Sequence, residues 1–326
     1  MVTHPDVFAA DVRIREHIRR TPLIRIASGS GPLWLKCEFM QHTGSFKARG
    51  AFNRVLSAKE RGELDPMVGI VAASGGNAGM ANAYAAARAG VPATVFVPRT
   101  APLIKVSRLR EYGADVRQVG AEYAEAFEAA TEYAAQTGAV FCHAYDQLEI
   151  AAGAGTLAEE ILHDEPTIDT LIVAVGGGGL LAGVLAGADG RARVVAAEPR
   201  TIPTLHAALA AGRPVDIAVS GVAADSLGAR RIGDVGFVTA TEMGVTSVLV
   251  DDADIAAARI RLWSEYRIAA EYGAATAYAA LVSGAYEPSA GERVCVVVCG
   301  ANTDPSTLNS SPADVREKIL IAPNRL

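Results

Sequence analysis

Apolar and polar residues alternate along this chain in a way that predicts short buried strands separated by amphipathic helices. After about residue 65, apolar runs of strand length are followed repeatedly by helical patterns. This order is typical of βαβ units that build a parallel sheet. The first series predicts strands or helices at 68–73, 78–89, 93–97, 103–112, 115–119, 122–136 and 139–142.

A second series of the same kind follows and indicates an α/β fold. It predicts elements at 147–163, 170–175, 180–188, 194–197, 203–211, 247–250, 252–267, 274–283 and 293–299. Before the first series we expect a helix at 6–20, a strand at 33–37 and a helix at 47–58, and in the tail a short helix at 314–320.

Composition narrows the classes of function. The net charge is −6, and no dense run of Lys and Arg offsets it, so we expect no nucleic-acid surface. The longest apolar runs, such as 69–73 and 171–175, are far shorter than the ~18 residues of a membrane helix, so we expect no membrane partner. The N-terminus turns polar at once, unlike a secretory signal. Four scattered cysteines without a Cys-x-x-Cys pair favour a reducing cytoplasm.

One lysine, Lys47, lies in a segment with unusual chemistry, 43–50 (TGSFKARG). It sits between an aromatic ring and small residues at a predicted helix start, and a helix N-terminus disfavours a nearby cation. Such a lysine loses its proton readily, and a neutral amine is what Schiff-base chemistry requires. Taken alone, the segment is at least as typical of a solvated lysine that begins an ordinary helix.

Two glycine-rich loops each join a predicted strand to a predicted helix, 74–79 (SGGNAG) and 175–180 (VGGGGL). Free amides at a helix start suit a carboxylate or a phosphate, and ligands of parallel sheets bind beyond the carboxyl ends of strands. Taken alone, the first loop is better explained as a plain turn with Asn77 near the N-cap. The second lacks the Walker Gly-Lys-Ser/Thr, although Glu198, about twenty residues on, leaves a dinucleotide site open at this point.

Together the three segments point to one ligand pair. A lysine for an aldehyde, amides for a phosphate and an asparagine loop for a carboxylate are what pyridoxal 5′-phosphate (PLP) and an amino acid require. The chain resembles the fold type II PLP enzymes (tryptophan synthase β-like), specifically the serine/threonine dehydratase and serine racemase family. The resemblance runs from about residue 15 to 305 and rests on Glu38, 43–51 (TGSFKARGA), 74–77 (SGGN), 176–179 (GGGG), 197–199 (AEP), 224–228 (ADSLG), 270–275 (AEYGAA) and 299–302 (CGAN).

The resemblance implies a role for several side chains. Lys47 would hold the cofactor as a Schiff base and move the Cα proton, and Phe46 would pack near the ring. Asn77 would bind the ring hydroxyl, and Glu271 would lie near the ring, unless it is only a helix-start carboxylate. Cys299 would face the pyridine nitrogen, where a thiol is a weak donor that suits elimination. Alternatively, Cys299 has no such role and is only a small, buried apolar residue.

The resemblance also assigns the two loops. The phosphate would be held by Gly176, Gly177, Gly178, Gly179 and Leu180. The substrate carboxylate would be received by Ser74, Gly75, Gly76, Asn77 and Ala78.

Two departures from the family pattern matter. Gly75 stands where racemase-competent relatives have a serine that protonates the opposite face of Cα, which favours a dehydratase. The divalent-cation site of the family would use Glu198, Ile202 and an aspartate, but Thr204 replaces that aspartate. Because a carboxylate is lost, Glu198 is only a weak metal candidate, and we expect a monovalent cation or no metal.

The resemblance therefore implies α,β-elimination from L-threonine or L-serine, giving a 2-oxo acid and ammonia in a cytoplasmic homodimer. We expect a large PLP-binding domain at 1–64 and 146–326 and a small inserted domain at 65–145, each with a twisted, mostly parallel sheet flanked by helices and with PLP in the cleft. We also expect no C-terminal regulatory domain of the kind found in biosynthetic threonine dehydratases. The alternatives are an amino-acid racemase, a β-replacement enzyme, disfavoured by Ala48 and Ala78, another lyase for β-hydroxy amino acids, and a non-catalytic nucleotide-binding module.

Overall fold

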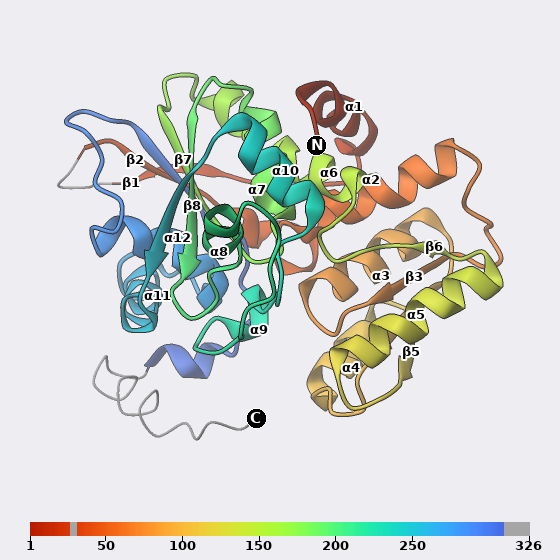
Figure 1. Ribbon diagram of the computed structural model, residues 1–326. Helices are drawn as coiled ribbons and strands as arrows, with labels where there is room; N and C mark the ends of the chain where they lie inside the picture. Colours follow the sequence, from red (N-terminus) through yellow and green to blue (C-terminus); the bar gives the residue numbers. More distant parts are fainter. Residues whose placement is uncertain (27–30, 310–326) are drawn as a thin grey trace.

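The computed structural model describes residues 1–26 and 31–309, and most of its strands belong to a six-stranded sheet (Figure 1). The strand order is β1-β2-β10-β7-β8-β9, and all neighbours are parallel except β1 and β2. Its strands are β1 Leu23–Ile26, β2 Leu33–Lys36, β7 Thr170–Ala174, β8 Arg193–Pro199, β9 Thr246–Val250 and β10 Val294–Val297.

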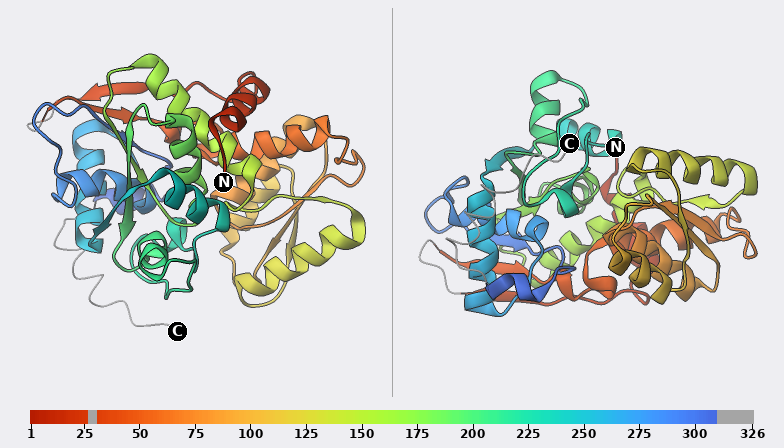
Figure 2. Two further views of the ribbon diagram at one scale, coloured as in Figure 1. Left: turned by 45° about the horizontal axis from the view of Figure 1, so that its top comes forward. Right: turned by 90° about the horizontal axis from the view of Figure 1, so that it is seen from below.

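A second sheet of four parallel strands stands apart from the first, and Figure 2 shows the separation from two further sides. Its order is β5-β4-β3-β6, with β3 Ile70–Ala73, β4 Ala93–Val97, β5 Asp115–Gln118 and β6 Val140–Phe141. All four strands fall within the segment 65–145. The domain limits at 64/65 and 145/146 stay a prediction.

Helices cover both sheets, and none within the described residues is long and apolar enough to cross a bilayer. Helix α2 packs against α6 beside the larger sheet and against α3 beside the smaller one. The helices are α1 His4–Ile14, α2 Lys47–Glu60, α3 Asn77–Ala89, α4 Leu103–Glu111, α5 Tyr123–Thr137, α6 Leu148–Asp164, α7 Gly179–Ala188, α8 Thr204–Ala211, α9 Ala224–Leu227, α10 Asp234–Met243, α11 Asp252–Tyr266 and α12 Tyr272–Val282, with 3-10 turns η1 Glu38–Met40, η2 His42–Gly44 and η3 Pro305–Asn309.

The strand pattern follows from burial on both faces. Every residue of β3, β4, β7 and β10 is buried, because helices lie on each side of these strands. Central parallel strands of this kind are continuous apolar runs rather than alternating ones. This confirms the α/β class with parallel sheets predicted from the sequence.

The prediction of a helix at 6–20 is wrong at its C-terminal end, since α1 ends at Ile14. The N–H of His17 turns back to Ile14 O at 2.8 Å, and the N–H of Arg19 donates to Gln41 Oε1 at 2.9 Å. A local turn and one tertiary hydrogen bond thus take the place of further helix. Sequence patterns also missed β1 and α10, and the helix expected at 314–320 lies outside the described residues.

Candidate active site

Lys47 is the first residue of α2, and no carboxylate of the described residues lies within hydrogen-bond distance of its amine. Its Nζ donates to Ala144 O at 2.7 Å and lies 5.0 Å from the centroid of the Phe46 ring. Burial lowers the pKa of Lys47 from 10.5 to about 8, opposed by Cys299 and Glu271. The lowered pKa agrees with the expectation from the sequence, and its largest cause is burial.

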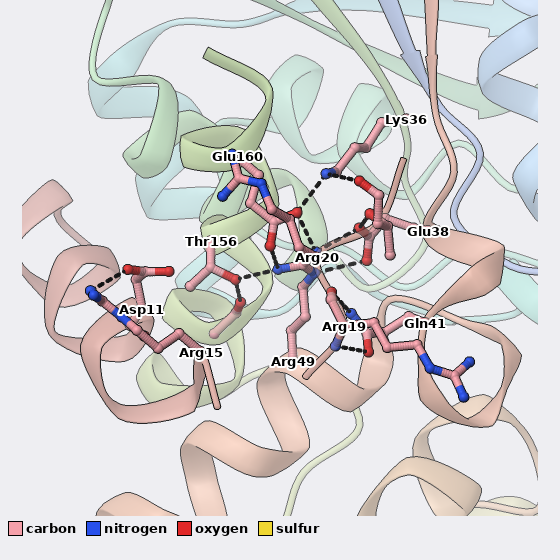
Figure 3. A network of polar contacts seen from close by, with 12 residues as sticks. Asp11, Arg15, Arg19, Arg20, Lys36, Glu38, Gln41, Arg49, Thr156 and Glu160 are labelled. Atoms are coloured by element: carbon pink, nitrogen blue, oxygen red, sulfur yellow. Dashed lines mark hydrogen bonds and ion pairs between the residues drawn. The ribbon is translucent and has the colours of Figure 1, made fainter. Parts of the chain in front are cut away.

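Arg49, two residues further along α2, lies in a buried network of matched charges (Figure 3). Its guanidinium donates twice to Glu38, from Nε and Nη2 at 2.8 Å, and also to both oxygens of Glu160 at 2.8 Å. Lys36 Nζ donates to Glu160 Oε2 at 2.5 Å. Two cations and two carboxylates balance, as buried charges require. The network joins β2 and η1 to α2 and α6 and so fixes the start of α2.

Asn77, at the start of α3, is held in one orientation by two partners. Its Nδ2 lies 2.9 and 3.1 Å from the two carboxylate oxygens of Glu271, and its Oδ1 accepts from Asn302 Nδ2 at 2.8 Å. The same Asn302 Nδ2 donates to Thr43 O at 2.7 Å. Burial raises the pKa of Glu271 to about 7, opposed by the hydrogen bond from Asn77. The predicted residues Asn77 and Glu271 are therefore direct neighbours.

Cys299 lies beside this pair and beside the lysine segment. The N–H of Phe46 donates to Cys299 O at 3.0 Å, and a Cβ added to Gly300 would lie 2.3 Å from Glu271 Oε1. Burial, with Glu271 nearby, raises the pKa of the Cys299 thiol, so it stays protonated. The structure thus brings Phe46, Lys47, Asn77, Glu271 and Cys299 to one place at the carboxyl end of β10.

The four glycines between β7 and α7 form a loop without room for side chains. A Cβ at Gly177 would lie 2.2 Å from the ring of Tyr145, and one at Gly179 would lie 2.5 Å from Tyr145 O. Gly178 has φ +87°, which glycine adopts at no steric cost. Tyr145 follows directly on Ala144, the partner of Lys47, so one short segment touches both the lysine and the glycine loop.

The amides of this loop find no acceptor in the part of the chain that the structure describes. Among the described residues, nothing accepts from the N–H groups of Gly176, Gly177 or Gly178, and the first N–H groups of α7 at Gly179 and Leu180 are likewise unused. Buried amides are seldom left unpaired. Convergent amides at a helix start are a nest for an anion such as a phosphate.

The turn between β3 and α3 offers a second set of amides. It is formed by Ser74, Gly75, Gly76, Asn77 and Ala78. Within the described ranges, the amides of Asn77 and Ala78 have no acceptor, whereas the N–H of Gly76 donates to Ser74 Oγ at 3.3 Å. A Cβ at Gly75 would meet only Val97 Cγ1, at an ordinary 3.6 Å, and its φ is not positive. Glycine is therefore not sterically required at this position.

Glu198 is occupied by protein donors. Its two oxygens accept from the N–H groups of Leu205 and His206 at 2.7 and 2.9 Å, which caps α8, and Thr204 Oγ1 lies 3.1 Å from Oε1. Burial raises its pKa to about 7. In the part of the chain that the structure describes, no group of three or more His, Cys, Asp or Glu side chains gathers to hold a metal ion.

Three residues that bear on the site were assigned no role from the sequence: Tyr145, Asn302 and Thr204. Tyr145 follows a predicted strand at 139–142, so its place beyond a strand end was a usable signal. Asn302 and Thr204 act through contacts with residues more than 25 positions away, namely Thr43, Asn77 and Gly176. Nothing local in the sequence reveals such contacts.

These residues fit PLP. A half-buried amine of lowered pKa suits the aldehyde, the unpaired amides suit the phosphate, and Asn77 suits the ring hydroxyl. Fold and site together define an α/β enzyme of the PLP-dependent class. The family model described as pyridoxal-phosphate dependent enzyme matches residues 14–300, and the chain belongs to this family.

Individual relatives differ in activity. The chain is 33% identical to an L-threonine ammonia-lyase of Geobacter sulfurreducens, covering 100% of this chain and 81% of that protein. It is 33% identical to a phenylserine dehydratase of Ralstonia pickettii, covering 94% and 95%. The structure of maize serine racemase superposes with a TM-score of 0.87 at 30% identity, covering 97% and 98%. All are similar over nearly the whole chain.

Proposed function

We propose that this protein is a PLP-dependent ammonia-lyase that eliminates water from L-threonine or L-serine and releases a 2-oxo acid and ammonia. The observation that carries the proposal is a half-buried lysine, Lys47, that has no carboxylate partner among the described residues and lies near a glycine loop with unpaired amides. The similarity of this chain to an L-threonine ammonia-lyase supports the same activity.

The proposal gives each side chain a task. PLP, when bound, withdraws electrons from the substrate Cα. Lys47, whose amine is neutral at mildly alkaline pH, takes the Cα proton. The amides after Ser74 hold the substrate carboxylate, and those of Gly176–Gly179 with Leu180 hold the phosphate. When PLP is bound, Asn77 and Glu271 would lie toward the ring hydroxyl, Phe46 would pack on the ring, and Cys299 would face the ring nitrogen without charging it.

Loss of the β-hydroxyl completes the elimination. The released enamine then takes up water and yields the 2-oxo acid and ammonia, so that one water leaves and one returns. The substrate side chain is open, because relatives of similar identity act on threonine and on phenylserine by name. Ammonia release from a panel of threonine, serine, 3-hydroxyaspartate and phenylserine tests the proposal. No ammonia from any of them would contradict it.

Gly75 favours elimination over racemisation. Racemisation needs a proton donor on each face of the planar Cα, within about 2.6–3.2 Å. Gly75 offers no side chain, yet has room for one. We expect the wild-type enzyme to convert L-serine to pyruvate with little D-serine, and Gly75→Ser to increase D-serine.

Chiral chromatography measures both products. Gly76→Ser is the matched control, because a Cβ there meets nothing within 4 Å and the hydroxyl stands one residue away. D-serine that accumulates as fast as pyruvate in the wild type would favour the racemase instead.

Three further properties are part of the proposal. Because Thr204 replaces an acidic ligand, the enzyme uses a monovalent cation or none, rather than a divalent ion. All four cysteines are free and buried, which suits a reducing cytoplasm. A homodimer is proposed from the family resemblance, and sedimentation or mass photometry tests it.

A further inference from the structure

Three carbonyl oxygens of the glycine loop, those of Gly176, Gly177 and Gly178, accept hydrogen bonds, whereas the loop amides have no acceptor among the described residues. Gly176 O accepts from Thr204 Oγ1 at 2.6 Å. The next two carbonyls, of Gly177 and Gly178, accept from the backbone N–H groups of Gly233 and Ala182 at 3.0 and 2.9 Å. In a trans peptide the carbonyl and the following N–H point in opposite directions, and no described peptide bond is cis. Holding each carbonyl therefore aims the following amide to the other side.

Thr204 is the one side chain among these three donors. A backbone N–H is present whatever residue supplies it, but the hydroxyl is lost on substitution. The peptide that it holds joins two glycines, Gly176 and Gly177, so no Cβ resists rotation of that peptide plane. Without the hydroxyl, the Gly176 carbonyl could turn toward the bound anion and the Gly177 amide away from it.

The position of Thr204 is itself fixed. It is the first residue of α8 and fully buried, and the next two N–H groups of the helix, at Leu205 and His206, donate to Glu198. Glu198 is the last residue but one of β8, the strand next to β7, and the glycine loop follows β7. Hydrogen bonds that involve Glu198, Thr204 and Gly176 thus fix the glycine loop relative to the sheet. All of these groups belong to the protein.

We propose that Thr204 is a positioning residue for the cofactor phosphate: its hydroxyl holds the Gly176 carbonyl so that the Gly177 amide donates to the phosphate. Thr204 stands where the family pattern has a metal-binding aspartate. A hydroxyl can donate a hydrogen bond to the Gly176 carbonyl, which an ionised carboxylate cannot do. The inference rests on PLP binding, and is otherwise independent of which amino acid the enzyme uses.

The test compares two ligands and two variants. Thr204→Val removes the hydroxyl at nearly constant volume, and Thr204→Ser keeps it. The dissociation constants of PLP and of pyridoxal, which lacks the phosphate, are measured on cofactor-free protein by the visible absorption band. We expect Thr204→Val to weaken PLP binding by roughly 10- to 100-fold, the loss of one hydrogen bond to a charged group. Pyridoxal binding should change by less than about threefold, and Thr204→Ser should resemble wild type for both ligands.

The inference fails if Thr204→Val leaves PLP affinity unchanged, or if it weakens PLP and pyridoxal equally, which would indicate general damage. If the valine variant does not fold, Thr204→Cys, whose thiol is a weaker donor, takes its place and must weaken PLP selectively. A wild-type protein that forms no visible band with PLP would instead contradict the proposed function.

Discussion

Lys47 and Arg49 lie two residues apart at the start of α2, yet their surroundings are opposite. Arg49 is fully buried and faces two carboxylates, Glu38 and Glu160. Burial alone would lower the pKa of its guanidinium, but the two carboxylates raise it above the ordinary value. Lys47 donates to a backbone carbonyl, and burial lowers its pKa to about 8. Burial penalises both cations, so the difference lies in the partners. A buried cation with matched charge is structural, and one without it is poised to react.

Removal of the Lys47 amine should have the largest effect on activity. Lys47→Ala should lower ammonia release by at least roughly 10³-fold, because proton transfer and cofactor attachment are both lost. Far-UV circular dichroism should stay unchanged. Lys59→Ala, at the exposed other end of α2, is the control and should keep wild-type activity. Comparable loss in both variants would remove the distinction.

Removal of the Arg49 charge should affect stability rather than the reaction itself. Arg49→Met leaves Glu38 and Glu160 with Lys36 alone, and an uncompensated buried carboxylate costs about 3–5 kcal/mol. Urea unfolding of the cofactor-free protein measures this loss. Arg61→Met, which breaks a solvent-exposed pair with Glu63, should cost less than about 1 kcal/mol. A stability loss no larger than that of the control would mean that the network is not structural.

Titration of the Lys47 amine tests whether its pKa is lowered. Only the neutral form of Lys47 attacks an aldehyde, and its pKa is about 8 rather than 10.5. The rate at which cofactor-free protein couples with PLP should therefore rise with pH and level off above a midpoint near 8. Stopped-flow absorbance measures the rate, with Lys47→Ala as background. A rate still rising steeply above pH 9 would show that burial does not lower this pKa.

Local patterns predicted the parallel α/β fold because buried strands such as β7 and β10 are continuous apolar runs. Taken together, three local segments and the family resemblance also made the glycine loop and Lys47 candidates for the site, because the features that single them out are adjacent in the sequence. The limits of α1 were missed because Gln41 captures the N–H of Arg19. The opposite surroundings of Lys47 and Arg49 could not be predicted from the sequence, since the partner of Arg49 on α6, Glu160, is 111 positions away.

The measurement that tests the central claim most directly is the site of cofactor attachment. Reduction of the PLP-loaded protein with borohydride makes the attachment permanent, and peptide mapping by mass spectrometry locates it. The lowered pKa of Lys47 and its place beside the glycine loop predict a pyridoxyl group on the peptide that contains Lys47. A pyridoxyl group on Lys36, which is paired with Glu160, or on any other lysine would contradict the account.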